Sequence, residues 1–152
     1  MMTPEEILTL IRDLYAKRIP FHQHIGVDTI ELQADSVEIK LNMRPELVGN
    51  PFFQILHGGV TASLLDAAGG MIAMATVVSE LEDFSPEHVQ RRLTKLGTID
   101  LRIDYLRPGR GETFTATARV IRKGRKVAVT RMELHNEVGD EIALGTATYM
   151  VG

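Results

Sequence analysis

HGGVTASLLDAAGGMIAMA, residues 57–75, is the stretch of the sequence that decides the fold. Its composition predicts a helix that is apolar on nearly every side, and we expect this central helix to span residues 57–79. A helix of this kind has to be covered all round by the rest of the chain. It nevertheless holds one aspartate, Asp66, although a carboxylate in apolar surroundings costs several kcal/mol unless it is paired, protonated or used. Asp66 is therefore the first candidate for a functional residue.

The same stretch raises the possibility of a membrane segment, because residues 58–79 carry a single charge and are long enough to span a bilayer. The glycines, the mid-span carboxylate and the lack of a flanking Lys/Arg cluster argue against it. The first residues, MMTPEEILTLIRDLY, are acidic and amphipathic, unlike a signal peptide. We therefore expect a cytoplasmic protein with no membrane partner.

Composition excludes several other classes of protein. The length predicts one domain, residues 1–152, with a core large enough to need no disulfide. The absence of cysteine excludes thiolate metal sites and a Cys nucleophile. The histidines outside the central helix show no metal-ligand spacing, so we expect no metal. The serines form no G-x-S-x-G motif, which excludes an α/β-hydrolase. The net charge of −3 gives no general attraction to nucleic acid.

The rest of the chain predicts short helices and antiparallel strands. Residues 1–20 contain a helix with Thr3 as N-cap, which ends before Pro20. Residues 27–43 alternate as a hairpin, and 44–56 are predicted to be a loop. Further on, residues 80–96 form an insertion with a short helix that starts at Ser85-Pro86 and is closed by Gly97, and 112–151 form a three-stranded meander.

These elements predict an α+β fold in which an antiparallel sheet wraps around a long central helix, because only the sheet is large enough to cover it. One helix face carries small residues at spacings of three and four. They would let another group approach closely, although tight helix packing alone also explains them. The face is made of Gly59, Ala62, Ser63, Asp66, Gly69, Gly70 and Ala73.

A His-Gly-Gly helix start, an acid nine residues after the His, and the strand end Tyr105-Leu106-Arg107-Pro108 together resemble the hotdog-fold acyl-CoA thioesterases. The chain is similar to those related to the phenylacetate-pathway enzyme, and within them to the YigI-type medium- and long-chain acyl-CoA thioesterases, over about residues 21–151. The resemblance implies a hotdog fold and hydrolysis of acyl-CoA to the free acid and CoA. It also implies no cofactor beyond the CoA of the substrate, and a homodimer, with a dimer of dimers expected.

The resemblance assigns roles to four residues. Asp66 falls at the catalytic carboxylate, and Gly58 at the position whose backbone N–H holds the thioester oxygen. His57 matches the His before that glycine, with an N-cap or packing role as the alternative. Thr98 falls where relatives have a Ser or Thr that helps to place water.

One position departs from the family pattern. The family's loop Asn falls here on Pro51, so the water-positioning amide is either Asn50, one place away, or Gln54. The sequence leaves the choice between them open.

The chemistry of thioester hydrolysis fits these residue types. The leaving thiol is comparatively acidic, with a pKa near about 8.5, so a strong general acid is not needed. A carboxylate partly shielded from solvent is a good base near neutrality, and the bared N–H groups of a helix start suit an oxyanion. Direct attack by the carboxylate, through an anhydride, stays open as an alternative.

Residues 107–126 are rich in Arg and Lys, which predicts a site for the phosphates of CoA. A solvated hairpin is the alternative, and the lack of interleaved aromatic residues argues against nucleic acid as a partner. The residues expected to bind the CoA portion are Arg107, Lys123, Gly124, Arg125 and Lys126.

Two rival functions share this pattern. A hotdog dehydratase would pair a His with a carboxylate in a different motif. A non-catalytic acyl-CoA sensor would keep the fold and the phosphate site, yet would not need Asp66. The acyl-chain length is left open, because it depends on how Phe52, Phe53, Met71, Met74 and the 80–96 insertion fold over the site.

Overall fold

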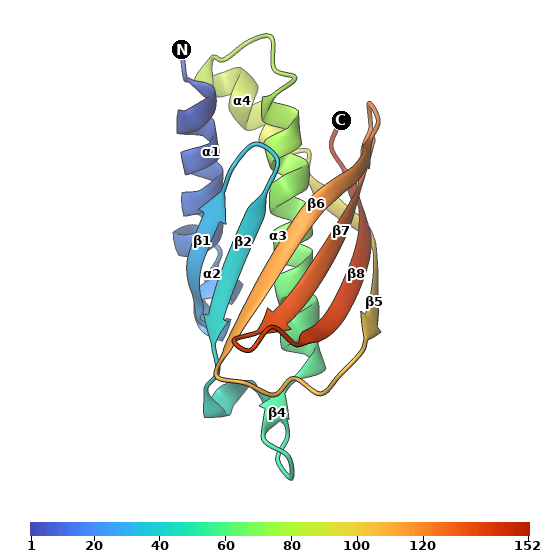
Figure 1. The fold of residues 1–152 in the computed structure, drawn as a ribbon. Coiled ribbons are helices and arrows are strands. Elements are labelled where there is room, and N and C mark those ends of the chain that lie inside the picture. The colour runs from blue at the N-terminus through green and yellow to red at the C-terminus, as the bar shows by residue number, and fades with distance from the viewer.

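A long buried helix with a single curled antiparallel sheet around it makes up the fold (Figure 1). The computed structural model describes residues 1–152, apart from the side chain of Thr29. The sheet has six strands in the order β1-β2-β6-β7-β8-β5, and every neighbouring pair is antiparallel. The predicted α+β class, with a sheet wrapped around a central helix, is confirmed.

The central helix, predicted over residues 57–79, is α3, Gly58–Val78, with His57 as its N-cap. From Ala67 to Ala75 every residue of α3 is buried, so this half is covered as expected. The expectation of cover on all sides is wrong for the first half. There a stripe stays half-buried or exposed, and it consists of Gly58, Gly59, Ala62, Ser63 and Asp66.

Two strand groups follow the predicted alternation. The hairpin is β1, Val27–Leu32, with β2, Val37–Asn42, and the meander is β6, Thr113–Lys123, β7, Val127–Asn136, and β8, Glu141–Met150. Both predictions are confirmed. Alternate residues of β7 and β8 are buried because one sheet face packs on α3 and the other meets solvent.

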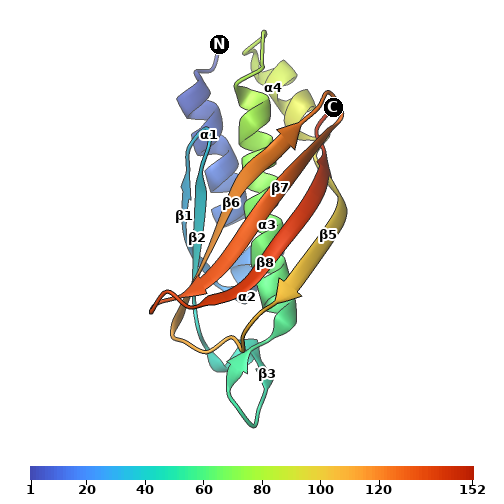
Figure 2. The ribbon, with the colours of Figure 1, turned by 45° about the vertical axis from the view of Figure 1, so that its right-hand side comes forward.

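The strand β5, Gly97–Tyr105, lies at the edge of the sheet and pairs with β8 (Figure 2). None of its residues is buried, and Ile99 and Tyr105 are 54% and 55% exposed. Within the part of the chain that the structure describes, no strand pairs with its outer edge. Such an edge has unpaired N–H and C=O groups that can accept another strand.

The N-terminal residues form three helical segments where one was predicted. A capping box at Thr3 starts α1, Pro4–Asp13, which lies beside α3. The chain then widens into a π-helix, η1, Leu14–Arg18, and Pro20 starts α2, Pro20–Ile25. The predicted stop before Pro20 is correct, but Pro20 also serves as the first residue of a new helix, where its missing N–H costs nothing.

Two predictions of local structure are wrong. Residues 44–56 are not simply a loop but contain η2, Pro45–Leu47, and a small hairpin of β3, Val48–Asn50, and β4, Ile55–Leu56, which protrudes at the foot of the molecule (Figure 1). In the 80–96 segment, the helix α4, Pro86–Leu93, ends at its C-cap Thr94. Gly97 therefore does not close this helix and instead begins β5.

The helix α3 is long and apolar enough to cross a membrane by length and composition alone. However, 78% of its most apolar window is buried inside the protein. The cover comes from the sheet and from α1, so the apolar surface of α3 is used as a protein core.

Candidate active site

The start of α3 presents a backbone N–H that is free to bind a ligand. The Nδ1 atom of His57 accepts the Gly59 N–H at 2.8 Å, which makes His57 the side-chain cap of the helix. Among the described residues, nothing accepts a hydrogen bond from the Gly58 N–H. Because the positive end of a helix dipole lies here, this N–H is suited to an oxyanion.

Backbone hydrogen bonds fix this helix start in place. The N–H of His57 donates to the carbonyl of Leu47 at 2.8 Å, and that of Leu56 donates to the carbonyl of Gly109 at 2.9 Å. Gly49 is needed for the close approach, since a Cβ there would lie 2.5 Å from the Cα of His57. The helix start is therefore held by the β3–β4 hairpin on one side and by the loop after β5 on the other.

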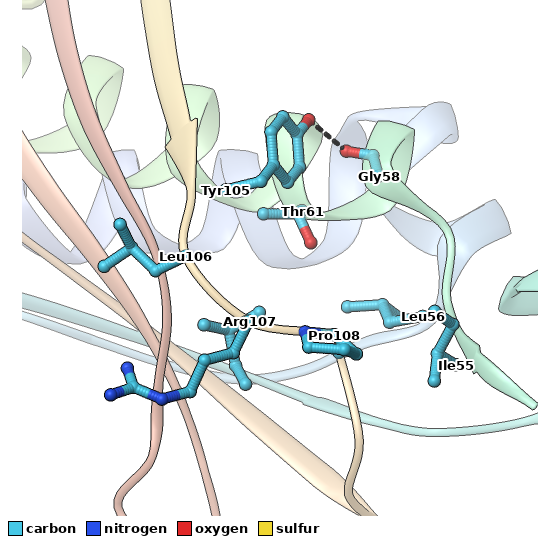
Figure 3. A pocket seen from close by; sticks show the side chains of 10 residues that line it. Ile55, Leu56, Gly58, Thr61, Tyr105, Leu106, Arg107 and Pro108 are labelled. Carbon is cyan, nitrogen blue, oxygen red and sulfur yellow. Dashed lines mark hydrogen bonds between the residues drawn. The ribbon is translucent and has the colours of Figure 1, made fainter. Parts of the chain in front are cut away.

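A pocket of about 420 Å³ opens beside Gly58, within the size range of small-molecule sites (Figure 3). Tyr105, at the end of β5, donates from its hydroxyl to the carbonyl of Gly58 at 2.7 Å. Arg107 also lines this pocket, but its side chain extends away from Gly58, and its Nη1 donates to the carbonyl of Glu141 at 2.8 Å. Two predicted site residues, Gly58 and Arg107, therefore line the same pocket.

Asp66 lies farther along α3, and its carboxylate is held at one oxygen. Thr98, at the start of β5, donates from Oγ1 to Oδ1 of Asp66 at 3.1 Å. The hydroxyl of Tyr149, on β8, lies 3.0 Å from the same Oδ1 and 2.9 Å from the backbone carbonyl of Asp66. No described residue bonds the other oxygen, Oδ2. The structure thus brings Asp66 and Thr98, two of the predicted site residues, together.

Tyr149 was not among the predicted site residues. Burial raises the pKa of its hydroxyl well above the ordinary value, and the Asp66 carboxylate raises it further, so Tyr149 keeps its proton and acts as a donor. A signal existed in the sequence, because Tyr149 ends the run Ala143, Gly145, Ala147 of inward-facing residues on β8. A large polar side chain after small ones on a buried face has to find a partner.

Gly69 explains part of the small-residue face of α3. A Cβ at Gly69 would lie 2.5 Å from the hydroxyl of Tyr149 and 2.8 Å from Oγ1 of Thr130. Glycine inside a helix costs roughly 0.5–1 kcal/mol relative to alanine. Close approach of the sheet, and of Tyr149 in particular, therefore requires glycine here.

The two parts of the candidate site are separate within one chain. Gly58 and Asp66 lie eight residues apart on α3, which at a rise of about 1.5 Å per residue separates them by roughly 12 Å. The first half-site consists of His57 and Gly58, and the second of Asp66, Thr98 and Tyr149. Both open on the same uncovered stripe of α3.

The two candidate amides lie on the protruding β3–β4 hairpin. The Oδ1 atom of Asn50 accepts the Phe52 N–H at 3.0 Å, and Nε2 of Gln54 donates to the carbonyl of Pro51 at 2.9 Å. This places both amides at the foot of α3, with the first half-site, and not beside Asp66 of the same chain (Figure 1).

The predicted CoA-binding residues do not form one cluster. Strand β6 runs between Arg107 at the foot of the sheet and the Lys123–Lys126 turn at its top, a span of roughly 30 Å at about 3.3 Å per residue. Lys123 forms an ion pair with Glu80, and its side chain is only 9% exposed. The N–H of Gly124 donates to the carbonyl of Val127. The idea of a single phosphate site over residues 107–126 is therefore wrong for one chain, and Arg125 and Lys126 are left as the exposed cations of the turn.

One group of residues has donor atoms close enough to hold a metal ion. Side-chain atoms of Glu133, His135 and Glu141 lie within 4.8 Å of one another. They alternate with buried residues such as Met132 and Leu134, so they face away from α3. This group belongs to the outer surface of the sheet and not to either half-site.

The chain is similar to known proteins over much of its length. The model of the thioesterase superfamily matches residues 53–143. The chain is 44% identical to the medium/long-chain acyl-CoA thioesterase YigI of Escherichia coli K12 over 152 residues, covering 100% of this chain and 98% of that one. It is 31% identical over 99 residues to acyl-coenzyme A thioesterase 13 of Pongo abelii, covering 64% of this chain and 61% of that one.

Solved structures share the whole fold. A crystal structure of a Shewanella oneidensis protein related to the thioesterase superfamily superposes with a TM-score of 0.94 at 52% identity, covering 98% of this chain and 97% of that one. The match includes the central helix, the sheet and the N-terminal helices. The chain therefore belongs to the thioesterase superfamily, with its hotdog fold.

Proposed function

We propose that the protein hydrolyses acyl-CoA thioesters, with medium- and long-chain acyl groups as substrates. The observation that carries the proposal is the Asp66 carboxylate, which is held at Oδ1 by Thr98 and Tyr149 and has Oδ2 free on the open stripe of α3. Asp66 is only half-buried, so water can reach Oδ2, as a carboxylate that activates water requires. The relatives named above as acyl-CoA thioesterases support the choice of substrate class.

In this proposal Asp66 takes a proton from water through Oδ2, and the resulting hydroxide attacks the thioester carbonyl carbon. The Gly58 N–H stabilises the negative charge that forms on the carbonyl oxygen. Thr98 orients Asp66. The C–S bond then breaks and CoA leaves as the thiolate, which its acidity allows without a strong general acid, and the proton held by Asp66 passes to the CoA sulfur or to solvent, which restores the carboxylate. His57 caps Gly59 with Nδ1, which leaves Nε2 as the ring nitrogen that carries the proton and can bind another group.

A homodimer completes the site. The reacting carbon has to lie within about 3–3.5 Å of the attacking water while its oxygen meets the N–H donor, so two groups roughly 12 Å apart on one helix cannot serve one carbonyl. A two-fold axis at the α3 stripe would set the Gly58 of one chain beside the Asp66 of the other, twice over. Such a partner would pair with the unpaired N–H and C=O groups at the free edge of β5 and would cover Phe52 of the β3–β4 hairpin, which is 90% exposed.

The same two-fold arrangement would bring the β3–β4 hairpin to the partner's Asp66. Asn50 or Gln54 would then hold the attacking water from the other chain. A dimer of dimers is the expected larger assembly, and sedimentation velocity would test it. The cytoplasm is the proposed location, on the sequence arguments given above.

The experiment that tests the function is release of free thiol from a panel of CoA esters, from acetyl to palmitoyl and including aryl groups. We expect turnover to rise with chain length into the medium and long range. Binding of acyl-CoA without thiol release across the whole panel would contradict hydrolysis and would favour the sensor.

Arg125 and Lys126, the exposed cations of the β6–β7 turn, are proposed to bind the phosphates of CoA, and Arg107 at the other end of β6 is not part of this site in the same chain. Changing Arg125 and Lys126 together to Gln should raise KM for acyl-CoA by about 5- to 20-fold, the range for one or two charge-assisted hydrogen bonds. KM for the matching acyl-pantetheine, which lacks the nucleotide, should stay within about twofold, since only the phosphate contacts are lost.

Two results would remove this assignment. Equal effects on both substrates would mean that the turn acts on the acyl or pantetheine part, or on folding. The change Arg119→Gln is the matched control, because it removes an exposed cation from the outer face of β6. An equal rise in KM in Arg119→Gln would mean that the effect comes from the general surface charge and not from a phosphate site.

A further inference from the structure

The two oxygens of the Asp66 carboxylate are in different surroundings. Oδ1 accepts hydrogen bonds from two hydroxyls, those of Thr98 and Tyr149, while Oδ2 has no partner among the described residues. Thr98 is exposed at the start of an edge strand. Tyr149 is 1% exposed and lies on β8, inside the sheet. Of the two donors, Tyr149 is therefore the one that solvent cannot replace.

The hydroxyl of Tyr149 also contacts two parts of the same residue. It lies 2.9 Å from the backbone carbonyl of Asp66 and 3.0 Å from Oδ1. A single donor placed between the main chain and the side chain of one residue restricts the rotation of that side chain. It therefore determines which oxygen faces the sheet and which faces the open stripe.

The position of Tyr149 is itself fixed from the other side. The hydroxyl sits against Gly69, where an added Cβ would come within 2.5 Å. Thr130, on β7 and 0% exposed, lies against the same position, with its Oγ1 2.8 Å from that Cβ. The phenol is thus held by three elements, α3, β7 and β8, and has little freedom to move.

We propose that Tyr149 is a positioning residue for Asp66, which holds Oδ1 so that Oδ2 is the oxygen presented to the attacking water. The inference rests on the proposed function, because it assigns a role to Tyr149 only if Asp66 does chemistry. Tyr149 touches neither water nor substrate in this role and acts through Asp66 alone.

The first test is Tyr149→Phe, which removes one oxygen atom and keeps the ring. We expect kcat to fall by about 10- to 100-fold, the loss that a small misplacement of a catalytic group produces. KM should stay within about twofold, because the substrate contacts are untouched. A variant with wild-type kcat, and with Asp66→Asn inactive in the same assay, would overturn the role of Tyr149 while leaving the proposed function intact.

The matched control is Tyr15→Phe. Tyr15 is a second buried phenol near Asp66, 8% exposed, and its hydroxyl would lie 3.1 Å from a Cβ at Gly70. No described hydrogen bond joins it to Asp66. We expect kcat within about twofold of wild type, since the removed hydroxyl does not hold the carboxylate. An equal loss in both variants would assign the effect to packing and would overturn the inference.

The double variant separates positioning from a merely structural role. Adding Tyr149→Phe to Asp66→Asn should cause no further loss of kcat, because no carboxylate is left to position. Multiplication of the two losses would mean that Tyr149 acts by another route, against the inference. Wild-type activity in Asp66→Asn would instead remove Asp66 from the mechanism, whereas no thiol release by the wild-type protein would defeat the proposed function.

If Tyr149→Phe does not fold, as judged by circular dichroism, Gly69→Ala gives the same test. A Cβ there would lie 2.5 Å from the Tyr149 hydroxyl and 2.8 Å from Oγ1 of Thr130, so β8 and α3 have to move apart, which breaks the hydrogen bond to Asp66. As for Tyr149→Phe, we expect kcat to fall about 10- to 100-fold while KM stays within about twofold of wild type. Full kcat in a folded Gly69→Ala protein, whose Tyr149 hydroxyl is shown to be displaced by its crystal structure, would overturn the inference.

Discussion

Replacing Asp66 with Asn is expected to lower kcat for acyl-CoA by on the order of 10²- to 10⁴-fold, the range for loss of a general base. The fold should survive, because the amide oxygen of Asn can accept the hydrogen bonds that Thr98 and Tyr149 give to Oδ1. The amide nitrogen would take the place of Oδ2 and cannot accept a proton from water. Free-thiol release and a thermal melt on the same preparation measure both expectations.

The matched control for this substitution is Asp100→Asn, which makes the same chemical change on β5. Asp100 is exposed and lies two residues from Thr98. Its change should leave kcat within about twofold. Wild-type turnover in the Asp66 variant would remove Asp66 from the mechanism. The substitution tests the carboxylate as such, since both a base and a nucleophile would be lost with it.

Mixing two inactive variants should restore activity if the site is shared between chains. One variant is Asp66→Asn, and the other is Gly58→Pro, which deletes the N–H proposed to bind the oxyanion. Each homodimer should have on the order of 1% of wild-type activity or less, because both of its sites lack one element. A mixed dimer has one intact site and one doubly damaged site. With statistical exchange, about a quarter of wild-type activity should return.

Gly58→Pro removes the N–H of residue 58 in a conformation that proline can adopt. Proline is favoured at the first position of a helix, and His57 before it has φ −61° and ψ 132°, a conformation that a following proline allows. A Cβ at Gly58 would approach Tyr105 to 3.3 Å, which the exposed tyrosine can relieve by a small shift. Gly58→Ala is the control, because it adds the same Cβ and keeps the N–H.

The mixing experiment is informative only if the two variants are shown to exchange subunits. Mass spectrometry of the intact complexes would establish that mixed dimers form. No recovered activity in the presence of mixed dimers would mean that Gly58 and Asp66 act within one chain, and the shared site would be wrong. Loss of activity in Gly58→Ala equal to that in Gly58→Pro would mean that the side chain, and not the N–H, is responsible.

The sequence predicted those features that depend on local periodicity. The apolar run gave α3, and alternation gave the β1–β2 hairpin and the β6–β8 meander. Asp66 could be singled out because a lone charge in such a run needs a reason. The resemblance gave Thr98 only as a residue that helps to place water. Its hydrogen bond to Asp66, 32 residues away, was not predicted, since no local pattern specifies which strand reaches a given turn of the helix.

Other features depend on register between distant elements, which a single sequence does not specify. Tyr149 reaches Asp66 across 83 residues, through the register of β8 and the space left by Gly69. Lys123 was counted with its neighbours as a cation for phosphate, yet its partner Glu80 comes from beyond the end of α3, 43 residues away. A charge count along the chain cannot detect such a pair.

The length and apolar composition of α3 also have a consequence for how the chain is made. Helix α3 leaves the ribosome roughly 70 residues before β8 is complete, which at about 5–20 residues per second leaves it uncovered for several seconds. During that time an apolar run of membrane-spanning length is exposed to the insertion machinery. A carboxylate near the centre of such a run opposes insertion by about 2.5–3.5 kcal/mol. We therefore expect Asp66, whatever its chemistry, to help keep the nascent chain in water, and Asp66→Leu to direct it toward membranes during synthesis.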